Sequence, residues 1–87
     1  MKLIFDEQAW DEYLRWQSLD KKTLKRINSL IADIQRNSFD GIGKPEPLRY
    51  QLAGCWSRRI DEKNRIVYRV VEDRIEIVSL CSHYGDH

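Results

Sequence analysis

The sequence predicts an α+β domain, in which a short N-terminal strand and a two-helix hairpin pack on an antiparallel β-sheet. Before residues 37–47, apolar residues recur with the helical period of 3.6 residues, and after this segment they recur with the period of two typical of strands. The segment itself holds two glycines and two prolines, which interrupt helices and central strands alike. Only short gaps separate the strand-like runs, so neighbouring strands are expected to be antiparallel.

One domain spanning residues 1–87 is expected, because a chain of 87 residues has room for a single hydrophobic core. Hydrophobic residues make up 41% of the chain, enough for such a core, and the 33% of charged residues are mixed in sign, which argues against disorder. Cys55 and Cys81 could form one bridge at most. No signal-peptide pattern or long apolar run is present, so we expect a cytoplasmic protein with free thiols and no membrane partner.

The first part of the chain is expected to form a strand and two helices. Lys2–Phe5 is a short apolar run typical of an edge strand, and Asp6 is placed to cap the first helix with its carboxylate. Asp20 is placed to open the second helix, and the short link makes the two helices an antiparallel hairpin. The expected packing residues are Trp10, Tyr13, Leu14 and Gln17 in the first helix and Leu24, Ile27, Leu30, Ile31 and Ile34 in the second.

Strand-like runs follow residue 47. Three are clear, Cys55–Ile60, Arg65–Val71 and Ile75–Tyr84, and Leu48–Leu52 is a candidate fourth. Even-numbered positions in the three clear runs are mostly apolar and are expected to face the helices. Odd-numbered positions are more polar and are expected to form an open face.

The composition of the open face depends on the lengths of two hairpin loops. The even-numbered residues of all three strands share one face, and the odd-numbered residues the other, only if each loop has an odd number of residues. The three-residue loops Asp61–Lys63 and Glu72–Arg74 satisfy this condition. This register places Arg59 opposite Arg65, and Arg65 opposite Cys81. Like charges directly opposite each other are destabilising, so the arginine pair predicts a nearby anion.

Basic residues are concentrated in one part of the chain. The net charge is only +1, but residues 44–69 contain seven basic and three acidic residues, a local net charge of +4. Two interpretations fit this distribution equally well: a face that meets an anionic partner, and arginines that decorate a solvated sheet.

The polar residues of the open face and its rim are those that RNA cleavage without a metal requires. A carboxylate can take the proton of the attacking 2′-hydroxyl, an imidazole can protonate the leaving 5′-oxygen, arginines can stabilise the phosphorane, and an aromatic ring can stack on a base. The chain supplies these groups, with no cofactor, in Glu46, His83, Arg59, Arg65 and Tyr84. Many small domains contain such residues, so the set alone does not identify a ribonuclease.

Other chemistries have weaker support. Cys81, His83 and His87 are too few and wrongly spaced for a standard zinc site. Residues 41–45, GIGKP, form a turn, because no strand precedes and no helix follows them as in a phosphate-binding loop. A Cys81 thiol activated by His83 would require contact across about 7 Å of strand.

Four short motifs are more specific. The segments GKPEPL, WSRRI and RIVY and the terminal HY, at this spacing, closely resemble the YoeB-type members of the RelE-like toxins of type II toxin–antitoxin systems, and the likeness spans Met1 to Tyr84. The resemblance implies a fold like that of small microbial ribonucleases. It also implies an endoribonuclease that cuts messenger RNA in the ribosomal A site and so inhibits translation. The implied partners are a YefM-type antitoxin and a second copy of the chain in a homodimer.

The resemblance implies roles for individual residues. Glu46 is implied as the general base and His83 as the general acid. Arg65, assisted by Arg59, is implied as the phosphate stabiliser, and Tyr84 as the residue that orients the substrate. Binding of RNA or the ribosome is expected at Lys44, Arg49 and Arg69.

Residues 85–87 are a short C-terminal tail beyond the His-Tyr pair at which members of the family often stop. Two alternatives to an active nuclease stay open at this point. One is a protein that occupies the A site without cutting the message, and the other is an inactive paralogue that only sequesters an antitoxin.

Overall fold

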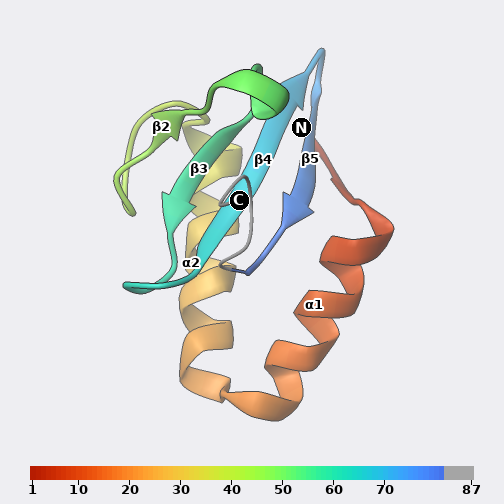
Figure 1. The fold of residues 1–87 in the computed structure, drawn as a ribbon, viewed down its shortest axis with the longest axis vertical. Helices are drawn as coiled ribbons and strands as arrows, with labels where there is room; N and C mark the ends of the chain where they lie inside the picture. Colours follow the sequence, from red (N-terminus) through yellow and green to blue (C-terminus); the bar gives the residue numbers. More distant parts are fainter. Residues whose placement is uncertain (82–87) are drawn as a thin grey trace.

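Two helices pack on one face of a five-stranded sheet, which confirms the α+β fold class (Figure 1). The computed structural model describes residues 1–81, so His83, Tyr84 and the tail 85–87 lie outside the described residues. The strand order is β1-β5-β4-β3-β2. In chain order the elements are β1 (Lys2–Phe5), α1 (Glu7–Leu19), α2 (Lys21–Arg36), β2 (Glu46–Pro47), the 3₁₀ helix η1 (Tyr50–Leu52), β3 (Trp56–Arg59), β4 (Arg65–Val71) and β5 (Arg74–Ser79).

The sheet is mixed, whereas the sequence predicted a purely antiparallel one. β1 runs parallel to β5, with Leu3 opposite Ile75, and the other neighbouring strands are antiparallel. Parallel neighbours require a long connection, and the whole chain between β1 and β5 supplies it. The edge position of β1 was predicted correctly, but its direction depends on a partner at the far end of the sequence.

Helix α2 forms as predicted. Its N-cap is Asp20, whose carboxylate accepts hydrogen bonds from the backbone N–H of Lys22 at 3.0 Å and of Thr23 at 3.2 Å. Four residues of the predicted stripe are buried in the core, and Leu24 is partly buried. The buried four are Ile27, Leu30, Ile31 and Ile34. Each such side chain contributes about 1.5–3 kcal/mol when it leaves water, so this stripe anchors the helix to the sheet.

Helix α1 packs through a face that shares only Tyr13 with the predicted one. Ala9 is its only fully buried residue, and Tyr13 and Trp16 pack against the core, whereas Trp10 is 46% and Leu14 40% exposed. Gln17 is exposed as well. The small Ala9 side chain allows the helix to approach the sheet closely, which periodicity alone does not reveal. Asp6 is the N-cap, but its carboxylate makes no capping hydrogen bond, contrary to prediction.

The β4–β5 hairpin differs from prediction in two places that compensate. Val71 pairs with Arg74, so the loop is the two-residue Glu72–Asp73 rather than Glu72–Arg74, and Glu72 has the positive φ, 56°, that tight hairpin turns require. Because the loop is one residue shorter, the odd-numbered Ile75 and Ile77 face the helices. The prediction had placed the even-numbered Val78 on that side.

A β-bulge then restores the predicted register. Tyr68 pairs with Ile77 but Val67 pairs with Ser79, so Val78 is an extra residue in β5. Beyond it Leu80 is buried in the core, as predicted, and the backbone N–H of Arg65 donates to the Cys81 carbonyl at 3.4 Å.

The fourth strand is β2 rather than Leu48–Leu52, most of which forms η1. β2 lies at the sheet edge, the position at which a strand tolerates a proline such as Pro47. β5 ends at Ser79, earlier than the predicted run to Tyr84. Cys55 and Cys81 are not joined by a disulfide, as expected.

Candidate active site on the open face of the sheet

A row of residues crosses the open face of the sheet from β2 to β5. Its members, each directly opposite the next, are Glu46, Ser57, Val67 and Ser79. Directly opposite residues of antiparallel strands point to the same face, so this row lies on the side away from the helices, behind which Ile66 and Tyr68 pack in the core. Glu46 is exposed at the edge, and the other three are buried.

The two arginines form the next row along the strands. Arg59 lies directly opposite Arg65, with the three-residue loop Asp61–Lys63 beyond them, as predicted. Arg59 is two residues from Ser57 on β3, so the arginine row is about 7 Å from the row that contains Glu46. One carboxylate and two arginines therefore share the face that the helices leave uncovered.

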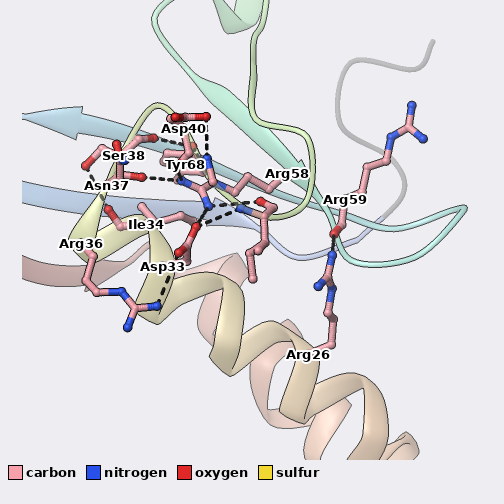
Figure 2. Close-up of polar contacts among 12 residues, drawn as sticks. Arg26, Asp33, Ile34, Arg36, Asn37, Ser38, Asp40, Arg58, Arg59 and Tyr68 are labelled. Atoms are coloured by element: carbon pink, nitrogen blue, oxygen red, sulfur yellow. Dashed lines mark hydrogen bonds and ion pairs between the residues drawn. The ribbon is translucent and has the colours of Figure 1, made fainter.

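The β3 backbone at Arg59 is held from two sides. Its N–H donates to the Gly43 carbonyl at 2.7 Å, and Arg26 Nη2 donates to its carbonyl at 3.2 Å. Gly43 has φ +80°, and a Cβ there would lie 2.8 Å from a Leu30 methyl, so a larger residue would push this loop away. The Arg59 side chain is exposed, extends away from Arg26 in Figure 2, and makes no ion pair within residues 1–81.

Arg58 points to the opposite side and organises the loop between α2 and β2 (Figure 2). Its side chain is fully buried, makes an ion pair with Asp33 and donates to Tyr68 Oη at 3.2 Å. The guanidinium also donates to three loop carbonyls, those of Asn37 at 2.6 Å, Asp40 at 2.9 Å and Ile42 at 3.1 Å. A buried cation is thus matched by one carboxylate and four neutral acceptors, the arrangement a buried charge requires.

Asp33 completes this connection from the helix side. Its Oδ2 also accepts from the backbone N–H of Ile42 at 3.1 Å, so helix, loop and strand meet at one carboxylate. The loop runs on directly to Lys44 and Glu46. The position of Glu46 is therefore set by two restraints, its own pairing with Ser57 and the Arg58–Asp33 network upstream.

Acid should weaken this network. The hydrogen bond from Arg58, and secondarily that from Ile42, hold the pKa of Asp33 below its ordinary value of 3.8. A carboxyl whose pKa is lower in the folded state stabilises the fold above the unfolded pKa and loses that contribution as pH falls through the folded pKa. We expect the free energy of unfolding, measured by urea titration, to fall below about pH 4.

Asp33→Asn is the matched variant for this prediction. It should be less stable than wild type at pH 7, and its free energy of unfolding should fall less steeply in acid. The decline should not vanish, because hydrogen bonds from Thr23 and Arg69 also lower the pKa of Asp20 and Glu76, respectively. An unchanged acid slope in Asp33→Asn would contradict the prediction.

The three basic residues expected to bind RNA or the ribosome differ in their surroundings. Lys44 and Arg49 are exposed and have no ion pair within the described part of the chain. Arg69, in contrast, forms an ion pair with Glu76, which also binds Arg74 at 3.0 Å. Arg69 therefore presents a partly neutralised charge, and Lys44 and Arg49 present full charges.

Two serines lie on the open face, as alternation predicts for odd-numbered positions, but nothing in the sequence indicates that they are buried. Ser57 is 1% and Ser79 5% exposed, and neither hydroxyl has a hydrogen-bond partner within residues 1–81. A serine on a half-polar sheet face is common, so only the register shows that both lie in the row of Glu46. The Arg58–Asp33 pair was also missed, although the odd-even alternation did place Arg58 on the helix side.

Within the described residues, no three His, Cys, Asp or Glu side chains lie close enough together to hold a metal ion. Over the same part of the chain, neither helix has the length and apolar character needed to cross a membrane.

Sequence comparison places the chain among toxins. The family model described as "YoeB-like toxin of bacterial type II toxin-antitoxin system" matches residues 5–84. Toxin YoeB of Escherichia coli K12 is 52% identical over 84 residues, which are 97% of this chain and 100% of the relative. Toxin YoeB of Streptomyces coelicolor is 49% identical with the same coverage.

Solved structures agree with the sequence comparison. The YoeB/ParE toxin from Agrobacterium tumefaciens superposes with a TM-score of 0.93 at 44% identity, covering 97% of this chain and 100% of the other. A Staphylococcus aureus YoeB, in a heterotetrameric complex with YefM, gives a TM-score of 0.88 at 44% identity, covering 97% and 98%. A mutant of YafQ from E. coli shares the fold, with a TM-score of 0.80, at only 12% identity, covering 94% of this chain and 92% of YafQ.

The α+β fold and these relatives define a toxin of a bacterial type II toxin–antitoxin system. Within that class, the chain belongs to the YoeB-like toxin family.

Proposed function

We propose that this toxin is an endoribonuclease that needs no metal ion or other cofactor and cuts messenger RNA in the A site of the ribosome, so that translation stops. One observation carries the proposal: Glu46 lies in the row next to Arg59 and Arg65, on the face that the helices leave open. A proton acceptor beside two cations is what attack of a 2′-hydroxyl on a phosphodiester needs. The family relationship supports the same activity.

The proposed reaction assigns one task to each group. Glu46 accepts the proton of the 2′-hydroxyl as its oxygen attacks phosphorus. Arg65, assisted by Arg59, stabilises the charge on the phosphorane, since guanidinium stays protonated and its planar fork matches phosphate oxygens. His83 gives a proton to the departing 5′-oxygen, and Tyr84 orients the substrate. Both lie outside the described residues and keep the roles that the family resemblance implies.

The remaining assignments concern partners and setting. RNA or the ribosome is proposed to bind at Lys44, Arg49 and Arg69. Arg69 would bind either within its ion pair with Glu76 or after that pair has separated. A YefM-type antitoxin is proposed to inhibit the toxin, because the similar Staphylococcus aureus protein is found in a complex with YefM. The toxin is also proposed to form a homodimer, because a dimer of the same Staphylococcus aureus protein is known. We further propose one cytoplasmic domain over residues 1–87, with 85–87 as a short tail.

The reaction can be tested with purified protein and ribosomes programmed with a defined message. Attack by the 2′-hydroxyl leaves a 5′-hydroxyl on the downstream fragment, whereas attack by water at the 3′-oxygen bond leaves a 5′-phosphate. We expect a 5′-hydroxyl fragment with its end in the A-site codon, and no fragment when the nucleotide before the cleaved bond is 2′-deoxy.

His83→Gln should reduce this cleavage by about 10²–10⁴-fold, the usual contribution of a general acid, with binding to the ribosome retained. Translation blocked without any new 5′ end would instead show a toxin that occupies the A site and does not cut. Neither cleavage nor inhibition would indicate an inactive paralogue.

A further inference from the structure

The side chain of Tyr50 is turned out into solvent. It is 85% exposed, against 69% or less for the other exposed large hydrophobic residues of the described chain. Within residues 1–81 its hydroxyl makes no hydrogen bond, and its ring makes no aromatic or cation–π contact. An aromatic ring left in water gains nothing for the stability of the fold.

The backbone at Tyr50 is also in a conformation that bulky residues avoid. Its φ is +59°, in the left-handed region, where glycine, asparagine and aspartate are favoured and a large side chain is a genuine outlier. Such conformations cost of the order of 1–3 kcal/mol and occur where the surroundings enforce them, often at functional sites.

The surroundings do enforce it. Within the turn, the Arg49 carbonyl accepts from Leu52 N–H at 3.1 Å and the Tyr50 carbonyl accepts from Ala53 N–H at 3.0 Å. Leu48 N–H donates to the Cys55 carbonyl at 2.9 Å and closes the turn at its base. The ring is therefore presented on a braced backbone rather than on a loose loop.

The turn is part of the structure that carries Glu46. Residues 46–57 form a hairpin of β2 and β3 with η1 at its tip (Figure 1). Tyr50 is four residues beyond Glu46, so their Cα atoms are separated by at most about 14 Å. Arg49, which precedes Tyr50, and Lys44, which precedes β2, are exposed cations without ion pairs in the described chain.

An exposed ring beside unpaired cations is the arrangement with which proteins hold single-stranded RNA, since the ring stacks on a base and the cations contact phosphates. Phe39 is a weaker candidate, because its ring already packs on Trp56 with the centroids 4.8 Å apart.

We propose that Tyr50 is a stacking platform for an unpaired nucleobase near the cleaved bond, and that it sets how tightly the toxin holds RNA and which bases it tolerates there. The base belongs either to the message or to ribosomal RNA. This proposal rests on the proposed function and adds a residue that determines specificity.

Tyr50→Asn separates this role from a structural one. Asparagine suits a left-handed backbone and has no ring, so the melting temperature should stay the same or rise. In single-turnover cleavage on programmed ribosomes, the concentration of toxin that gives half the maximal rate should rise between about 5-fold and about 100-fold, the range expected for loss of one stacked base. The rate at saturation should stay within about 3-fold of wild type, because Tyr50 contacts no reacting atom.

Two further variants complete the test. Tyr50→Phe keeps the ring and should stay within about twofold of wild type in both parameters. Gln51→Ala alters the exposed neighbour in the same 3₁₀ helix and should have no effect.

Abasic nucleotides in the message distinguish the two sources of the base. If the base is in the message, one abasic position near the cut should raise the half-saturating concentration of wild type but not that of Tyr50→Asn. If the two changes are additive at every position, the base is in ribosomal RNA. If Tyr50→Asn binds and cuts like wild type, the stacking role is wrong even though the toxin cleaves RNA. If wild type itself does not cut, the proposed function and this inference both fall.

Discussion

Arg58→Ala is expected to destabilise the fold by about 3–5 kcal/mol, because it leaves the Asp33 carboxylate and several loop carbonyls without their buried cation. For a domain of this size, that loss lowers the melting temperature by at least about 12 °C. The backbone groups affected, at Asn37, Asp40 and Ile42, span the whole connection from α2 toward β2. The chain between α2 and β2 should then become sensitive to proteases before the sheet unfolds.

Arg36→Ala is the matched control. Arg36 contacts the same carboxylate at 3.4 Å, but its side chain is 75% exposed, and exposed ion pairs contribute about 0–1 kcal/mol. Thermal unfolding followed by circular dichroism should therefore show a large shift for Arg58→Ala and almost none for Arg36→Ala. Comparable small shifts in both would mean that the buried network contributes little.

Glu46→Gln is expected to lower the rate of message cleavage by about 10²–10⁴-fold, the effect typical of a lost general base. Glutamine has nearly the same size and shape and β2 pairs through its backbone, so the hairpin should keep its geometry. The half-saturating concentration should stay near that of wild type, because the proton transfer, and not the binding of RNA, is removed.

Glu62→Gln removes an equal charge from an exposed loop beyond β3 and should leave the rate unchanged. A Glu46→Gln variant that cuts at the wild-type rate would exclude Glu46 as the base.

Much of the architecture can be predicted from local sequence. The stripe of α2, its cap at Asp20 and the bounds of β4 follow from period and capping chemistry, which act between residues close in the chain. The opposition of Arg59 and Arg65 also follows, because a three-residue loop joins their strands and fixes the register. The candidate site was therefore recognisable on the β3–β4 side from alternation alone, and the family from its motifs.

Features that join distant segments were decided only by the tertiary structure. The two-residue loop after Val71 reverses the predicted alternation, and the bulge at Val78 restores it. No sequence pattern in β5 predicts the loop length or the bulge. The packing face of α1 depends on how closely Ala9 can approach the sheet, and the parallel direction of β1 depends on β5 at the other end of the chain.

The Arg58 network is the clearest case of this division. The sequence by itself determined that Arg58 faces the helices, since alternation requires it. Whether a buried arginine is tolerated there depended on acceptors up to 25 residues away, at Asp33 and along the loop after α2. Hydrogen bonds to a buried charge are set by three-dimensional placement and not by period, so the anchor of the loop that leads to Glu46 became visible only in the folded molecule.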